Sequence, residues 1–170
     1  MASPIILTLQ LDAASDERFQ SARDRWFPPK LNRVPAHLTL FHHLPGEERD
    51  EVVRLLAESC ARRAPFPVSV AEVIGMGAGV AVRLRSSELE ALRAELAGKY
   101  KPWLTAQDRQ GFRAHVTLQN KVTKATAEAC RREIEEGFSP WEARAEGVQI
   151  WSYEGGPWGT LGAIGFGGAR

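Results

Sequence analysis

The sequence predicts a domain of mixed helices and strands that is built of two similar halves. The chain has 170 residues, of which 44% are hydrophobic and 25% are charged, as in an ordinary globular domain. Segments with the two-residue period of strands alternate with segments that have the helical period. Residues 37–40 read His-Leu-Thr-Leu and residues 115–118 read His-Val-Thr-Leu, each inside an apolar, strand-like stretch. We therefore expect residues 1–170 to form one domain of two lobes that share a core.

The first half is predicted to contain a strand, a helix, a motif strand and a second helix. Residues 5–11 form the first strand because they are almost wholly apolar. Ser15 is the expected N-cap of the following helix, which Pro28 ends. The first motif strand is expected over 34–44, and a helix over 47–63 follows it.

The second half is predicted to repeat this order after a pair of strands. The strands cover 66–74 and 80–84 and flank a glycine-rich turn. Ser87 and Glu90 form the capping box of the next helix, and 101–110 is expected to be a loop. The last predicted elements are the second motif strand over 112–122, a helix over 123–138, and strands over 148–153 and 160–166.

Charge, cysteine content and hydropathy exclude several classes of protein. The net charge of +1 argues against a purely electrostatic nucleic-acid binder and favours a small or short substrate. Cys60 and Cys130 are expected to be core thiols in a reducing cytoplasm. No signal peptide and no apolar run of membrane-spanning length is recognised. We expect a cytoplasmic monomer with no membrane contact.

Side chains alternate between the two faces of a strand, and this alternation predicts a polar cleft. The apolar faces belong to the core, and His42 is expected there too. The polar faces carry His37, Thr39, Phe41 and His43 on the first motif strand, and Arg113, His115, Thr117, Gln119 and Lys121 on the second. Two such faces side by side would present two imidazoles, two hydroxyls and several cations to one place.

This set of side chains fits phosphate chemistry without a metal. Imidazoles that titrate near pH 6.5 can divide the acid and base roles at neutral pH. Hydroxyls and cations can bind the non-bridging oxygens of a phosphate and stabilise the charge of a transition state. Aspartate and glutamate are absent from both motif faces, so no metal and no other cofactor is predicted.

Aromatic residues near the end of the chain are the expected contacts for a nucleobase. Trp151 and Tyr153 share one face of the late strand and could form an aromatic wall, and Phe41 could stack on a base. The turn over 155–159 carries Trp158 and is expected to be a surface hairpin, with a lid as the alternative.

The two tetrapeptides and their flanks resemble the paired His-x-Thr motifs of the 2H phosphoesterase superfamily. The nearest branch is the bacterial 2′-5′ RNA ligase and cyclic nucleotide phosphodiesterase group. The resemblance implies a bilobal α+β fold with two antiparallel-rich sheets and outer helices around a central cleft, duplicated about a pseudo-two-fold axis. It also implies that His37 and His115 are the acid–base pair and that Thr39 and Thr117 bind the phosphate.

The sequence thus leads to one principal hypothesis and two alternatives. The first is a metal-independent phosphodiesterase or RNA ligase that acts on 2′,3′-cyclic phosphates or 2′-5′ linkages of nucleotides or short RNA. The second is a module that binds a nucleotide monophosphate or RNA in the same cleft without turnover. The third is a two-histidine metal protein, for which only His43 offers a third ligand.

Overall fold

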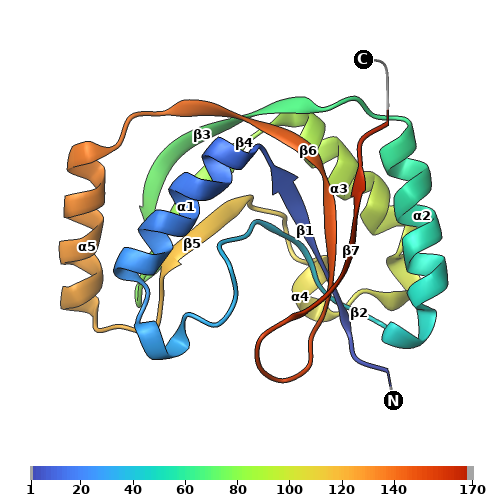
Figure 1. The fold of residues 1–170 in the computed structure, drawn as a ribbon, viewed down its shortest axis with the longest axis horizontal. Coiled ribbons are helices and arrows are strands. Elements are labelled where there is room, and N and C mark those ends of the chain that lie inside the picture. The colour runs from blue at the N-terminus through green and yellow to red at the C-terminus, as the bar shows by residue number, and fades with distance from the viewer. Residues whose placement is uncertain (1, 168–170) are drawn as a thin grey trace.

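Seven strands form one antiparallel sheet in the computed structural model, which describes residues 2–167 (Figure 1). Five α-helices and three short 3₁₀ turns complete the described part of the chain. The strands are β1 (Ile5–Leu11), β2 (Thr39–Leu44), β3 (Phe66–Gly75), β4 (Val80–Arg85), β5 (His115–Gln119), β6 (Trp141–Ser152) and β7 (Gly159–Gly165). The α-helices are α1 (Ala13–Trp26), α2 (Arg49–Ala61), α3 (Ser87–Lys99), α4 (Ala106–Arg109) and α5 (Lys124–Gly137). The 3₁₀ turns are Pro29–Leu31, Gly46–Glu48 and Lys101–Trp103.

The order of the strands is symmetric about the middle of the sheet. It runs β2-β1-β6-β3-β4-β5, with β7 attached to β6. Each motif strand therefore lies at an outer position and pairs with the strand that precedes it, β2 with β1 and β5 with β4. The α+β, duplicated fold class is confirmed. The two expected sheets are the halves of one continuous sheet, which the antiparallel pairing of β3 with β6 joins.

The helices that connect each pair of strands cross from one half of the molecule to the other. Helix α1 follows β1 in the chain but packs beside β5, and α3 follows β4 but packs beside α2 (Figure 1). Helix α5 covers β3 and β4, and α2 also contacts β7. None of the helices described has both the length and the apolar character needed to cross a membrane.

The core forms where the inner face of the sheet meets these helices. Side chains that alternate along β1 and β3, such as Leu7, Leu9 and Val68, are almost fully buried. They pack in one cluster with Leu92 and Leu96 of α3. Burial of a side chain of this size contributes about 1.5–3 kcal/mol, so this cluster holds the two halves together.

Two helices begin earlier than the sequence predicts. Asp12, and not Ser15, is the N-cap of α1, because its carboxylate accepts a hydrogen bond from the backbone of Ser15 at 3.1 Å. Ser86, and not Ser87, caps α3 and accepts from Leu89 N at 3.1 Å. In both places two residues able to cap lie close together, and composition alone does not choose between them.

Several strand boundaries also differ from the expectations. The motif strands are shorter than predicted, and β6 begins at Trp141, seven residues before the expected start. Ala143 and Ala145 lie in this early part of β6 and are buried where it pairs with β3. Alanine has little preference for strands, so the sequence pattern did not indicate a strand here. The predicted loop over 101–110 contains helix α4, which Thr105 caps.

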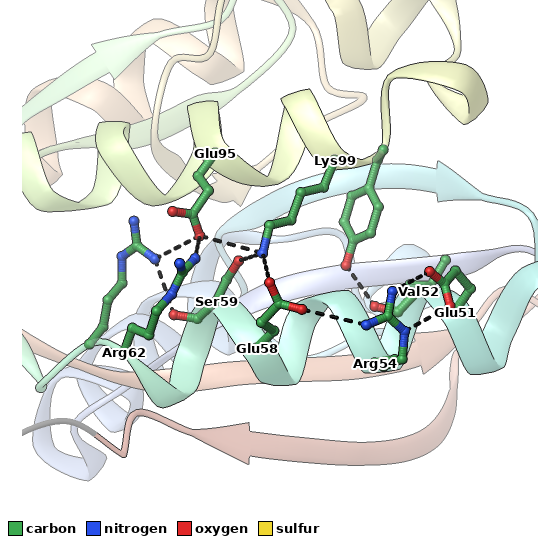
Figure 2. Close-up of polar contacts among 10 residues, drawn as sticks. Glu51, Val52, Arg54, Glu58, Ser59, Arg62, Glu95 and Lys99 are labelled. Atoms are coloured by element: carbon green, nitrogen blue, oxygen red, sulfur yellow. Dashed lines mark hydrogen bonds and ion pairs between the residues drawn. The ribbon is translucent and has the colours of Figure 1, made fainter.

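Helices α2 and α3 are joined by a network of ion pairs (Figure 2). Glu95 accepts from Arg62 at 2.9 Å and from Arg63 at 3.1 Å, and Lys99 donates to Ser59 at 2.9 Å. Burial alone would raise the pKa of Glu95, but hydrogen bonds from Ser59 and Arg63 and the nearby guanidinium charges lower it to about 2. The carboxylate is therefore charged at neutral pH and holds the two helices together.

Candidate active site

The imidazoles of the two motifs are held in the same way. His37 Nδ1 lies 2.7 Å from the carbonyl oxygen of Pro35, and His115 Nδ1 lies 2.7 Å from that of Arg113. A carbonyl can only accept, so each Nδ1 carries the hydrogen and donates. Each neutral ring therefore keeps a lone pair on Nε2, which is the form that can accept a proton from a substrate.

The segment around His37 is fixed by backbone hydrogen bonds although it precedes β2. Ala36 N donates to the side chain of Gln20 at 2.7 Å, and Leu9 N donates to Leu38 O at 2.9 Å. These bonds tie the segment to α1 and β1. They explain why His37 has a defined position outside the regular strand.

The motif threonines lie on the same side of the sheet as the histidines. Thr39 pairs with Thr8 of β1, and Thr117 pairs with Ala81 of β4. Both threonines are half-buried. The Thr117 hydroxyl has only a long contact of 3.8 Å with the sulfur of Met76, so it can still donate to a ligand.

A cavity of about 260 Å³ brings residues of both motif strands together. Thr39 of the first motif and His115 of the second line it, and its other polar lining residues include His42, Arg93, Asp108 and Arg113. His37 is close enough for the charges of His42 and His115 to affect its pKa. The two halves of the chain thus contribute to one polar site.

The environment of His37 favours its neutral form. Burial is the main cause that lowers the pKa of His37, to about 4, and the hydrogen bond to Pro35 opposes this shift. The charges of Arg23, His42 and His115 lower it further. At neutral pH the ring is therefore uncharged, as a general base must be.

Two buried arginines each bind the motif strand of the other half of the chain. Arg23 of α1 donates to Thr117 O of β5 at 3.0 Å. Arg93 of α3 donates to Leu40 O of β2 at 2.7 Å. Since each guanidinium reaches the motif strand of the other half, these bonds fix the relative position of the two strands.

The first motif strand does not keep the alternation that the sequence predicts. Thr8 pairs with Thr39 and Leu7 pairs with Phe41, so two steps along β2 match one step along β1. Such a bulge shifts every later side chain to the other face. Phe41 is therefore 0% exposed and packs in the core against Tyr100, which corrects its assignment to the substrate site. His42 lines the cavity, which corrects its assignment to the core.

A buried carboxylate holds His42 in this position. Asp108 Oδ1 lies 2.9 Å from His42 Nδ1, and the Asp108 side chain is 1% exposed whereas that of His42 is 42% exposed. Asp108 also accepts from the backbone of His42 and His43 at 3.0 and 3.1 Å. Burial alone would raise the pKa of Asp108, but these bonds lower it overall. Sequence reasoning missed this pair because Asp108 lies in a segment expected to be a loop.

The second motif strand has a bulge as well. Thr117 pairs with Ala81 and Gln119 with Val80, so an extra residue of β5 turns Gln119 inward. Gln119 is 2% exposed and its Oε1 has no partner among the described residues, which corrects its assignment to the cleft. Lys121 lies beyond the strand with a φ of 61° and is exposed. Of Arg113, Gln119 and Lys121, which were all predicted to bind the substrate, only Arg113 lines the cavity.

Aromatic rings approach His37 from the connection between β6 and β7. The ring centroid of Trp158 lies 4.6 Å from that of His37 and 5.9 Å from that of Trp151. Trp151 is fixed by a bond from its Nε1 to Thr8 Oγ1 at 2.9 Å. Tyr153 lies after the end of β6 and is 46% exposed. Residues 153–158 connect β6 to β7, where a hairpin was expected over 155–159. Trp158 of this connection packs beside His37 and was not among the predicted site residues.

The chemistry available at this site is proton transfer and anion binding. His115, Thr39 and Arg113 line the cavity and supply an imidazole, a hydroxyl and positive charge. His37 and Thr117 do not line it, but the charge of His115 reaches His37. Within residues 2–167, no group of three or more His, Cys, Asp or Glu side chains is placed to hold a metal ion.

Several solved structures share the fold of this chain. TT0787 of Thermus thermophilus is 16% identical over 98% of this chain and 100% of its own, with a TM-score of 0.69. LigT of E. coli, complexed with 3′-AMP, is 16% identical over 98% of this chain and 99% of its own, with a TM-score of 0.68. Usb1 of Kluyveromyces marxianus is 17% identical over 94% and 97%, with a TM-score of 0.51. These likenesses show the fold.

The sequence comparisons identify the family. A search of curated proteins gave no match. The family model of the 2′-5′ RNA ligase superfamily matches residues 11–157, a range that includes both histidine motifs. Because this match covers most of the chain, the protein belongs to the 2′-5′ RNA ligase superfamily of 2H phosphoesterases.

Proposed function

We propose that this protein is a metal-independent phosphodiesterase or RNA ligase that acts on 2′,3′-cyclic phosphates or 2′-5′ linkages. Membership of the superfamily supports phosphodiesterase or RNA ligase activity in general. The observation that carries the finer proposal is the matched pair of Nδ1–carbonyl bonds at His37 and His115. It leaves two Nε2 atoms free for an acid and a base at one phosphate.

In hydrolysis of a 2′,3′-cyclic phosphate, His37 acts as the base. Its neutral Nε2 takes a proton from water while the water oxygen forms a bond to phosphorus. The bond from phosphorus to one ribose oxygen breaks, and protonated His115 gives its proton to that oxygen. The low pKa of His37 supports this division of roles.

Ligation would follow the same course with another nucleophile. A 5′-hydroxyl replaces water as the attacking group, and the strain of the cyclic phosphate drives the new bond without ATP. In the reverse reaction, which cleaves the linkage back to the cyclic phosphate, the two histidines exchange roles. Thr39 and Thr117 donate to the non-bridging oxygens in both directions and stabilise their charge.

The proposed substrate is a nucleotide or the end of a short RNA. Trp158 and Trp151 offer aromatic faces beside His37 on which a base can stack. LigT of E. coli, which shares the fold, was crystallised with 3′-AMP, with NADP+ and with ATP. We propose further that residues 1–170 work as a single domain and as a monomer, since both halves contribute to one site.

The test is hydrolysis of the four nucleoside 2′,3′-cyclic monophosphates with EDTA present. Wild type is compared with His37→Ala and His115→Ala, and each variant is expected to lose about 10²–10⁴-fold in turnover. His43→Ala is the matched control, because His43 is an exposed histidine of β2. Tight binding of 3′-AMP by a wild type that turns over none of the substrates would favour the binding module instead.

A further inference from the structure

A second cavity, of about 410 Å³, adjoins the two-histidine site and is lined by three arginines. Arg83 and Arg85 come from β4, and Arg113 precedes the second motif histidine. We propose that Arg83 and Arg85 form a subsite for a second phosphate of the substrate. This inference rests on the proposed function and names its substrate class: an oligonucleotide end with at least two phosphates, in preference to a nucleoside cyclic monophosphate.

The pairing of β4 with β5 places these arginines on the same face as His115. Arg83 is the direct cross-strand partner of His115, so their Cβ atoms are about 5 Å apart. Arg85 lies two residues further along β4, which is about 7 Å at the rise of a strand.

The guanidinium of Arg83 lacks a partner for one of its donors. Its Nε is buried and has no hydrogen-bond acceptor among the described residues. A buried donor without an acceptor costs about 1–3 kcal/mol, and a phosphate oxygen would remove that cost once the Arg83 side chain turns its Nε toward the cavity. Arg83 is therefore placed to bind an anion that the protein itself does not supply.

Arg85 has a partner that an anion can replace. It donates to Glu72 at 2.7 Å, but both side chains are more than half exposed. Surface pairs of this kind contribute between about 0 and 1 kcal/mol, so Arg85 can turn toward a phosphate at little cost. Glu90 also lines the cavity and opposes an anion, but three guanidinium groups outweigh one carboxylate.

The subsite adjoins the reacting centre. Phe112 and Arg113 line both cavities, so the two cavities lie next to each other and share this border. The whole chain has a net charge of only +1, so three arginines around one cavity are a local concentration of positive charge. A substrate whose cyclic phosphate lies at His115 can therefore extend its neighbouring phosphate to Arg83 and Arg85.

The experiment compares two substrates that differ by one nucleotide. Adenosine 2′,3′-cyclic phosphate carries one phosphate, and the dinucleotide ApA with a 2′,3′-cyclic phosphate end carries two. Arg85→Gln and Arg83→Gln are expected to lower kcat/KM for the dinucleotide about tenfold or more, since bonds to charged groups contribute about 1.5–3 kcal/mol. Activity on the mononucleotide should stay within about twofold for Arg85→Gln, the more distant of the two. Arg54→Gln is the matched control, since Arg54 is an exposed arginine of α2 with carboxylate partners.

Two results would overturn the subsite. One is an equal loss on both substrates with Arg85→Gln, and the other is no loss on either substrate with both variants. If wild type turns over neither substrate, the proposed function fails, and calorimetry then tests the subsite on its own. ApA with a 3′-phosphate should bind wild type about tenfold more tightly than 3′-AMP, and Arg85→Gln should abolish the difference. Equal affinities in wild type would refute the subsite whether or not the protein is an enzyme.

Discussion

Replacing Asp108 with asparagine should destabilise the protein and disturb the candidate site together. Asp108 Oδ1 accepts from His42 Nδ1 and from His42 N, and Oδ2 accepts from His42 N and His43 N, all at 2.9–3.1 Å. An asparagine amide keeps only one acceptor oxygen. If its NH₂ group faces the backbone, N–H groups of His42 and His43 lose their acceptor; if it faces the ring, His42 must move its hydrogen to Nε2 so that Nδ1 can accept.

The expected magnitude follows from this count of bonds. A donor left without an acceptor costs about 1–3 kcal/mol, so His42 is expected to change its tautomer and avoid this cost. The bonds still lose the strengthening that a carboxylate charge gives, which amounts to about 1 kcal/mol for each bond. Asp108→Asn should therefore lower the free energy of unfolding by about 1–3 kcal/mol at pH 7.

Urea unfolding at pH 7 and pH 3 measures this effect. The pKa of Asp108 is lowered, so its stabilising contribution is complete above the ordinary value of 3.8 and is lost as pH falls below it. The difference in the free energy of unfolding between wild type and variant should thus be smaller at pH 3 than at pH 7. Glu128→Gln, on the exposed face of α5, is the control. A gap at pH 7 within about 0.5 kcal/mol, the usual range for surface changes, would refute the reasoning.

Three further predictions concern stability, phosphate binding and base stacking. The pKa of Glu95 is about 2 in the folded protein, against an ordinary value of 4.5. The stabilisation that its carboxylate gives is therefore complete above pH 4.5 and is lost as pH falls toward 2. Urea unfolding of Glu95→Gln and wild type should give free energies of unfolding that converge over that window. Thr39→Val and Thr117→Val should each lower kcat on cyclic phosphates by less than either histidine variant, because they remove one donor to the phosphate; steady-state kinetics that find wild-type kcat would exclude that threonine. Trp158→Ala should weaken binding of 3′-AMP by about 1–3 kcal/mol in calorimetry, and an unchanged Kd would mean that the ring only covers His37.

The elements and the duplication could be predicted from the sequence because they depend on periodicity and on a repeated motif. The helices after each motif and the pairing of similar halves follow from patterns that each segment carries within itself. The faces of the motif strands could not be read in the same way. Phe41 and Gln119 both come after a bulge, and a bulge is set by how two strands pair and not by either sequence alone.

The contacts that complete the site are long-range, and local patterns do not encode them. Asp108 meets His42 across 66 positions of the chain, and Arg23 reaches Thr117 across 94. Trp158 approaches His37 only because β7 folds back on β6. The crossing of α1 and α3 between halves creates such contacts, so they could be found only once the fold was known.

The most direct test of the two-histidine mechanism is a double-mutant cycle on cyclic phosphate hydrolysis. It compares kcat/KM of wild type, His37→Ala, His115→Ala and the double variant, all with EDTA present. If both rings act in one concerted step, each single variant loses about 10²–10⁴-fold and the double variant loses little more, since residues that act as a unit are not additive. Near wild-type activity in either single variant, or loss of wild-type activity with EDTA, would contradict the mechanism.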